Sequence, residues 1–333
     1  MEKVRALLER CDAPQGFMVQ YGLGGGAGSG CGARMVAQLL EDTPALMIQT
    51  NTLYPSLDET DTPLQILNTV LTHVQLSECT SPTLMFDNRA LTHHCRANFG
   101  IQNPSTEDLN CTLNQFLLNY TSAFRFHCYP QYTMLKIALN LIPFPRNHFI
   151  TPGLNHGKLE DYLIDQGTGP LASYPKIVTH LHVDNSYLLD VKNDRRHMTL
   201  YAQFRSCPNL STYNLEASFK AYSEKNSSYF MNWIETQNTC VVRDYEIKGL
   251  KQKPSSIFLS NTTRVHAKFT KILERFKEVY KRKAYLHLYT QEGCMEEGDF
   301  NQAQYHMEDM VSIYSMFDYD TDADEEDEEG EVE

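Results

Sequence analysis

Three features are missing from this 333-residue sequence, and each absence argues against a class of protein. No uninterrupted apolar run approaches the ~18 residues of a membrane-spanning helix, so we expect no membrane span. No apolar segment follows the charged start at Met1–Arg10, so we expect no secretory signal. The nine cysteines include no C-x-x-C pair, which favours reduced thiols over a disulfide framework or a zinc site. Together these absences predict a cytoplasmic protein.

Positive charge is also scarce, since the net charge at pH 7 is −13. Residues Asp318–Glu333 hold eleven Asp or Glu and no Lys or Arg, so the other 317 residues carry only −2. A like-charged run of this kind repels itself and is predicted to be a disordered acidic tail. Such a tail makes nucleic acid an unfavourable partner and a basic protein surface a favourable one.

The first part of the chain alternates between strand-like and helix-like segments. The expected elements, in order, are strand Phe17–Tyr21, helix Ala33–Glu41, strand Ala45–Leu53, helix Thr62–Leu76, strand Thr83–Phe86 and helix Thr106–Phe124. Ser105 or Thr106 is the expected cap of the last helix. This alternation predicts an α/β fold with a parallel, partly Rossmann-like sheet over residues 1–142.

The remainder of the chain has a different pattern. Strand-like segments over residues 143–262 predict a second, α+β domain; they lie at 146–151, 177–183, 199–206, 227–234, 239–245 and 256–262. Residues 263–317 are expected to form C-terminal helices at 264–282 and 298–314, ahead of the acidic tail at 318–333. The cations of the first of these helices predict a solvated face, which could also serve for docking: Lys268, Lys271, Arg275, Lys277, Lys281, Arg282 and Lys283.

Seven residues between the first strand and the first long helix, Gly24–Gly30, are nearly all glycine. Glycine lets several backbone N–H groups converge on one anion, and the following helix adds its N-terminal dipole. Phosphate binding is therefore one interpretation, and a flexible linker or plain tight turn is the other. No Lys-Ser/Thr follows, so this is not a Walker A loop, and the spacing does not fit a dinucleotide fingerprint.

Other polar residues stand where ligands bind in α/β folds. Asp87-Asn88 ends a predicted strand, and the amides of Asn88 and Asn110 could bond a purine edge, although either asparagine taken alone is more often a cap or turn residue. His93-His94 is expected on a helix, where adjacent side chains point in different directions and give poor metal geometry. His180 and His182 share one predicted strand face and could chelate a metal, but no Cys or acid ligand pattern accompanies them. We therefore expect no metal site, and no nucleophile–base arrangement is visible.

Several motifs, in order along nearly the whole chain, resemble the tubulin family and β-tubulin most of all. They are Gly24–Gly30, Asp87–Leu91, Asp108–Asn110, Pro143–Arg146, Pro152-Gly153, Asn226–Phe230 with Trp233-Ile234, Arg282–His287, and the acidic tail. The resemblance implies a tubulin/FtsZ-like GTP-binding fold. It places GTP on Gly24, Gly25, Gly26, Ala27, Gly28 and Ser29, with the guanine on Asn88 and Asn110. It also implies a cytoskeletal, microtubule-forming role, an α-tubulin-like partner, and basic microtubule-associated proteins bound to the tail.

The chain also departs from the family pattern. It begins where roughly a quarter of the family fold should already have passed, so Mg²⁺ is expected only if that segment exists. Ala27 replaces a Thr, Thr106 a stacking Tyr, and Gln65 an acid at the ribose. Cys128, Gln131 and Thr133 replace Gly, Asn and Asp in the loop that reaches the neighbouring subunit. Lys136 matches the β-type lysine, and a cation cannot act as the base for hydrolysis. The segment 154–168 does not resemble the loop of lateral contacts.

Three hypotheses follow from these observations. The first is a β-tubulin-like subunit whose nucleotide site is weakened or incomplete and whose hydrolytic activity is lost. The second is a tubulin-derived interaction module, or a non-functional fragment, that neither binds GTP well nor polymerises. The third is a dehydrogenase that uses the glycine run for a dinucleotide, which the missing fingerprint disfavours.

Overall fold

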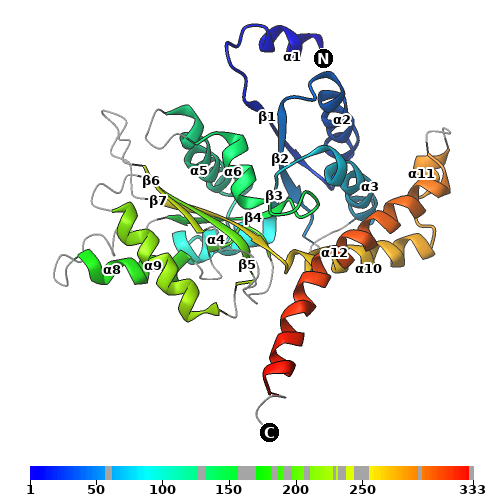
Figure 1. The fold of residues 1–333 in the computed structure, drawn as a ribbon. Helices are drawn as coiled ribbons and strands as arrows, with labels where there is room; N and C mark the ends of the chain where they lie inside the picture. Colours follow the sequence, from blue (N-terminus) through cyan, green and yellow to red (C-terminus); the bar gives the residue numbers. More distant parts are fainter. Residues whose placement is uncertain are drawn as a thin grey trace.

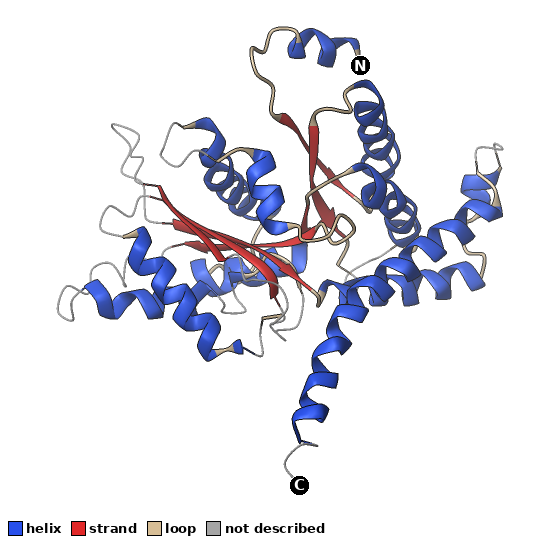
Figure 2. Ribbon diagram, viewed as in Figure 1, coloured by secondary structure: helices blue, strands red, loops and turns tan. Residues whose placement is uncertain are grey.

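A seven-stranded sheet in the order β1-β2-β3-β4-β7-β5-β6 forms the centre of the fold (Figures 1 and 2). This computed structural model describes residues 1–56, 62–126, 132–156, 170–181, 186–190, 197–205, 211–227, 230–231, 238–243, 255–291 and 295–329. Strands β1 (Gly16–Gly22), β2 (Met47–Tyr54), β3 (Thr83–Asp87) and β4 (Phe149–His156) are parallel. Strand β7 (Ser255–Thr262) is antiparallel to both β4 and β5 (His197–Arg205), and β6 (Asn238–Arg243) is parallel to β5.

The helices cover both faces of this sheet. They are α1 (Glu2–Leu8), η1 (Ala27–Gly32), α2 (Ala33–Asp42), α3 (Leu64–Cys79), α4 (Asn88–Phe99), α5 (Thr106–Arg125), α6 (Met134–Leu141), α8 (Pro170–Leu181), α9 (Thr212–Lys225), α10 (Val265–Lys281), α11 (His287–Thr290) and α12 (Glu297–Glu329). The parallel sheet predicted for the first part of the chain is confirmed. Strand β4 pairs with β3 and with β7, so the sheet is continuous across residue 143, where the sequence predicts a second domain.

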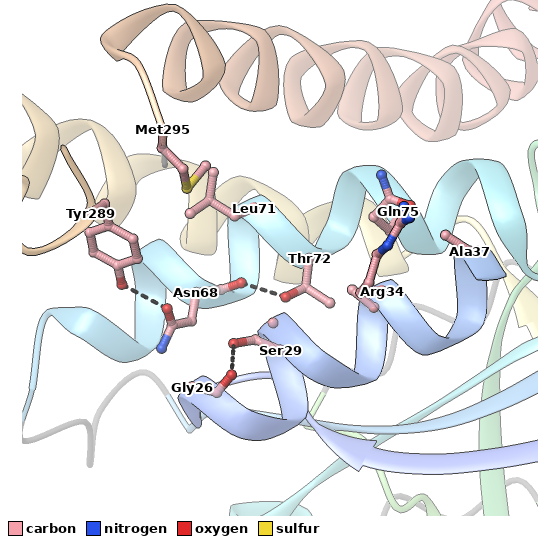
Figure 3. A pocket seen from close by; sticks show the side chains of 12 residues that line it. Gly26, Ser29, Arg34, Ala37, Asn68, Leu71, Thr72, Gln75, Tyr289 and Met295 are labelled. Atoms are coloured by element: carbon pink, nitrogen blue, oxygen red, sulfur yellow. Dashed lines mark hydrogen bonds between the residues drawn. The ribbon is translucent and has the colours of Figure 1, made fainter. Parts of the chain in front are cut away.

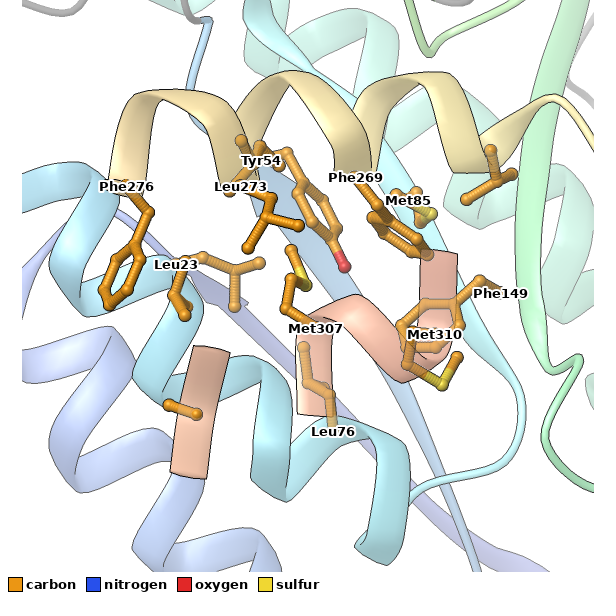
Figure 4. Packing of buried hydrophobic residues seen from close by; sticks show 14 of the residues in the cluster. Leu23, Tyr54, Leu76, Met85, Phe149, Phe269, Leu273, Phe276, Met307 and Met310 are labelled. Carbon is orange, nitrogen blue, oxygen red and sulfur yellow. The ribbon is translucent and has the colours of Figure 1, made fainter. Parts of the chain in front are cut away.

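Two large apolar clusters pack on the sheet. One joins α3, α10 and α12 to the sheet through Tyr54, Met85, Phe149, Phe269 and Met307, all of which are buried (Figure 4). The other lies under α4, α5 and α6 and includes Phe86, Phe116, Tyr120 and Ile137. Helices α10 and α12 therefore form part of the main core, and α12 extends beyond it (Figure 1).

The strand predicted at 177–183 is wrong, because α8 occupies these residues as far as Leu181. Its buried residues Tyr174, Ile177, Val178 and Leu181 follow helical spacing and pack in one cluster. A short apolar run fits either period, so the β-branched pair Ile177-Val178 was misleading. His180 therefore lies in a helix, and His182 lies outside the described residues.

Three further predictions need adjustment. Strand 227–234 lies partly outside the described residues, and Phe230 makes only an isolated bridge to His197.

The glycine turn is shorter than Gly22–Gly30, because the chain is already helical from Ala27. The tail predicted as disordered from Asp318 continues α12 to Glu329, because extending a helix that is already packed avoids the cost of nucleating a new one.

Candidate functional site

The glycine turn joins the end of β1 to the start of η1 and is held in place from both sides. The backbone N–H of Leu23, whose side chain is fully buried, donates to the carbonyl of Leu53 on β2 at 3.0 Å. Ser29 is buried; its N–H donates to the carbonyl of Gly25 at 2.9 Å and its hydroxyl to that of Gly26 at 3.3 Å. The Ser29 side chain therefore stabilises the turn from within and is not presented to solvent.

Two kinds of glycine stand in this turn. A Cβ on Gly28 would lie 2.3 Å from the carbonyl oxygen of Gly22, so close approach of helix and strand requires glycine there. Gly25 and Gly26 are exposed, and a Cβ on either would meet nothing within 4 Å. The first N–H groups of a helix have no acceptor within it, and here they adjoin this open space. The turn can therefore accept an anion at Gly25–Ala27.

The two predicted asparagines are exposed at the starts of two neighbouring helices. Asn88 is the first residue of α4, which Asp87 caps by accepting the N–H of Arg89 at 3.0 Å. Asn110 lies in the second turn of α5, whose start is fixed by a capping box between Ser105 and Asp108. The predicted cap at Ser105 is confirmed, and both amides are free of the core.

The glycine turn and the start of α4 share one edge of the sheet. The turn follows the carboxyl end of β1 and α4 follows that of β3, and these strands are parallel. Helix α5 packs beside α4, where the thiol of Cys95 lies 3.3 Å from the hydroxyl of Thr112. Ligands of open α/β sheets bind at this edge. The arrangement offers backbone N–H groups for an anion and two amides for a base.

A contact that the sequence did not predict fixes the turn to the C-terminal helices. The side-chain amide of Asn68 on α3 donates to the carbonyl of Gly24 at 3.0 Å. The hydroxyl of Tyr289 on α11 donates to the Asn68 carbonyl oxygen at 2.7 Å (Figure 3). Burial raises the pKa of Tyr289, so it remains a donor at neutral pH. Asn68 and Tyr289 are 221 positions apart in the chain, and no local sequence spacing links them.

A pocket of ≈ 460 Å³ lies between α2 and α3, behind the glycine turn (Figure 3). Small residues of η1 and α2, including Gly30, Ala33 and Ala37, line one side, and Leu71 and Gln75 of α3 line the other. Its lining is mainly apolar and includes Gly26 and Ser29, so the pocket adjoins the glycine turn.

The residues that depart from the family pattern occupy definite places. Gln65 in the first turn of α3 lies beside Gly24, whose Cβ would stand 3.3 Å from that of Gln65. Thr133 caps α6 by accepting the N–H of Lys136 at 3.2 Å, and the Lys136 ammonium lies 4.8 Å from the ring centre of Tyr132. Cys128 and Gln131 lie outside the described residues.

The described residues show neither a metal cluster nor a membrane-spanning helix. No group of three or more His, Cys, Asp or Glu lies together in a way that could hold a metal ion. Within the same residues, no helix is both long and apolar enough to cross a bilayer.

The fold is that of an α/β protein whose largely parallel sheet is covered by helices. Residues 1–96 match the Tubulin/FtsZ family, GTPase domain. The chain is 34% identical to the Tubulin beta-6 chain of Gossypium hirsutum over 335 residues, which covers 99% of this chain and 72% of that protein. The chain therefore belongs to the tubulin family, and the predicted resemblance to β-tubulin is confirmed.

Proposed function

We propose that this chain is a β-tubulin-like cytoskeletal subunit that binds a guanine nucleotide weakly at the edge formed by the glycine turn, α4 and α5. One observation carries the proposal. The open helix start at Gly25–Ala27 lies on the same edge of the parallel sheet as the exposed amide of Asn88, and Asn110 is exposed on the adjacent helix α5. A nucleotide needs this combination, an anion site for phosphates and an amide pair for the base.

The residues divide the nucleotide between them. The N–H groups of Gly25, Gly26 and Ala27 would hold phosphate oxygens, with Gly24 and Gly28 shaping the turn and Ser29 stabilising it. A Cβ on Gly25 or Gly26 would meet nothing within 4 Å, and this open space supports phosphate binding at the turn.

Binding is expected to be weaker than in an ordinary tubulin for two reasons. Ala27 has no hydroxyl to donate to a phosphate, and a hydrogen bond to a charged group contributes about 1.5–3 kcal/mol. Thr106, at the exposed start of α5, has no aromatic ring to stack on the base. Both residues are identified as substitutions by comparison with the family pattern.

The proposed subunit does not trigger hydrolysis in a neighbour. Lys136 stands where hydrolysis would require a base, and its ammonium lies over the ring of Tyr132. The proposed partners are an α-tubulin-like subunit in a polymer and basic microtubule-associated proteins that bind the acidic segment 318–333. Binding of Mg²⁺ would require ligands from outside the glycine turn, which offers only backbone groups, one buried hydroxyl and a methyl group.

An interaction module that does not handle nucleotide is the second candidate. Helices α10 and α12 pack along each other, with an ion pair Lys277–Glu308 at 2.8 Å between them. Lys283, just after the end of α10, pairs with Glu297 at the start of α12 at 2.7 Å. This paired surface ends in the acidic segment and needs no nucleotide for its structure.

Nucleotide titration of the purified chain separates the two candidates. The subunit hypothesis predicts saturable GTP binding, preferred over ATP, which Asn110→Ala weakens. The matched control is Asn114→Ala, because Asn114 is also exposed and lies one turn further along α5. A folded chain that binds no GTP at millimolar concentration would favour the interaction module. Equal loss in both variants would contradict the assigned role of Asn110.

A further inference from the structure

The carboxylate that caps α4 is completely enclosed. Asp87 ends β3, its side chain is 1% exposed, and its backbone N–H donates to the carbonyl of Leu188 at 3.0 Å. One carboxylate oxygen accepts the hydroxyl of Ser56 at 2.6 Å and the N–H of Arg89 at 3.0 Å. The neighbouring residue in the chain is Asn88, which is exposed at the candidate site. Because this carboxylate caps α4, its orientation influences the position of Asn88, the first residue of the helix.

The other carboxylate oxygen accepts a hydrogen bond from a lysine that reaches it from the C-terminal helices. Lys268 lies on α10, 181 residues further along the chain, and its side chain is only 5% exposed. The sequence predicted this lysine on a solvated face, and that prediction is wrong. Its neighbour Phe269 is fully buried, so this side of α10 lies against the core.

The burial of this ion pair is not explained by stability alone. Removing two charges from water carries a large desolvation cost, and apolar side chains of similar volume often stabilise a core as well or better. A lone buried carboxylate would cost still more. With Ser56 and Arg89 on one oxygen and Lys268 on the other, both Asp87 oxygens are bonded and the carboxylate is fixed in one orientation.

We propose that Lys268 is a positioning residue for nucleotide recognition: it fixes Asp87, which caps α4 and so holds Asn88 in place for the purine edge. The inference rests on the proposed guanine site. Without the lysine, Asp87 must move toward water, and the nearest exposed positions in the chain are Asn88 and Arg89. The start of α4, which carries the Asn88 amide, then loses its cap, whereas the glycine turn after β1 keeps its own contacts.

The test is the ratio of GTP to ATP affinity, measured by calorimetric titration of the full chain. Lys268→Met is expected to lower this preference about threefold to tenfold, the range for one net hydrogen bond, while ATP affinity changes little. Lys277→Met is the matched control, because Lys277 lies on the same helix but pairs with Glu308 at the surface, and its preference should equal that of the unmodified chain. Thermal melting confirms that each variant is folded.

Each outcome decides the matter. Equal losses of GTP and ATP affinity would show a merely structural lysine, and unchanged preference in folded Lys268→Met would also overturn the proposal. Should Lys268→Met fail to fold, Ser56→Ala removes a contact to the same carboxylate without burying a charge and should lower the preference about twofold to threefold. An unchanged preference in folded Ser56→Ala would then overturn it. An unmodified chain with no GTP preference would refute the proposed guanine site itself, and the inference with it.

Discussion

His73 is expected to lower the stability of the folded chain when the pH becomes mildly acidic. Its ring, 1% exposed on α3, stacks on Phe149 at 4.8 Å and meets Phe269 edge-on at 4.7 Å between ring centres. Burial, followed by the nearby His148 and His306, lowers the pKa of His73 from 6.5 to about 3. The Nε2 atom has no hydrogen-bond partner among the described residues. A proton therefore binds poorly to this site in the folded chain.

The sign and size follow from linkage. Below about pH 6.5 the unfolded chain binds a proton at this histidine and the folded chain does not. The free energy of unfolding therefore decreases as the pH is lowered from about 6.5 to about 3. Each pH unit in this window corresponds to 1.36 kcal/mol. Between pH 7.5 and pH 5 the loss is about 2 kcal/mol, a large part of the ~5–15 kcal/mol that stabilises a typical domain.

The perturbation is His73→Leu, which removes the titrating group and the unpaired nitrogen at similar volume. Urea unfolding followed by circular dichroism at pH 7.5 and pH 5 gives the free energies. The variant should lose about 2 kcal/mol less than the unmodified chain on acidification, because the contribution of His148 is common to both. His93→Gln, at an exposed position of α4, is the control and should behave as the unmodified chain. Identical pH dependence in all three proteins would refute the reasoning.

Three further predictions concern the site and the tail. Gly28→Ala should destabilise the fold by about 1–3 kcal/mol in urea unfolding, because the added Cβ would lie 2.3 Å from a carbonyl oxygen. Gly26→Ala should leave stability unchanged, because its added Cβ lies in open space, and should weaken GTP binding instead. The reverse order would contradict the assigned roles. Tyr289→Phe removes the donor to Asn68 and should cost about 0.5–1.5 kcal/mol of stability and speed amide exchange in the glycine turn, and unchanged exchange would argue against this tether. Deleting 318–333 should leave the melting temperature unchanged and weaken pull-down of basic microtubule-associated proteins most at low salt, so undiminished pull-down would remove the tail from partner binding.

The sequence predicted the parts of the fold that local patterns determine. Glycine between a strand and a helix indicated the tight turn before η1, and Ser105 with Asp108 three residues later indicated the start of α5. The helix at α8 was missed because Ile177-Val178 fits a strand when read alone, and only its packing with Tyr174 and Leu181 shows the helical face.

The long-range contacts of the site were beyond reach for a different reason. Lys268 reaches Asp87 and Tyr289 reaches Asn68 across 181 and 221 residues, and no spacing rule connects such positions. A lysine in a helix rich in cations is usually exposed, so the composition of α10 favoured an exposed position for Lys268. Only the packing of α10 against the core turns this lysine inward.

The most direct test of the central claim is amide hydrogen exchange across the chain with GTP, with guanosine and with neither. If the N–H groups at Gly25–Ala27 bind the phosphates, GTP should slow exchange there and guanosine should not. Both ligands should slow exchange at the starts of α4 and α5, where Asn88 and Asn110 lie. Protection by GTP elsewhere in the chain, with none in the glycine turn, would contradict the proposed nucleotide site.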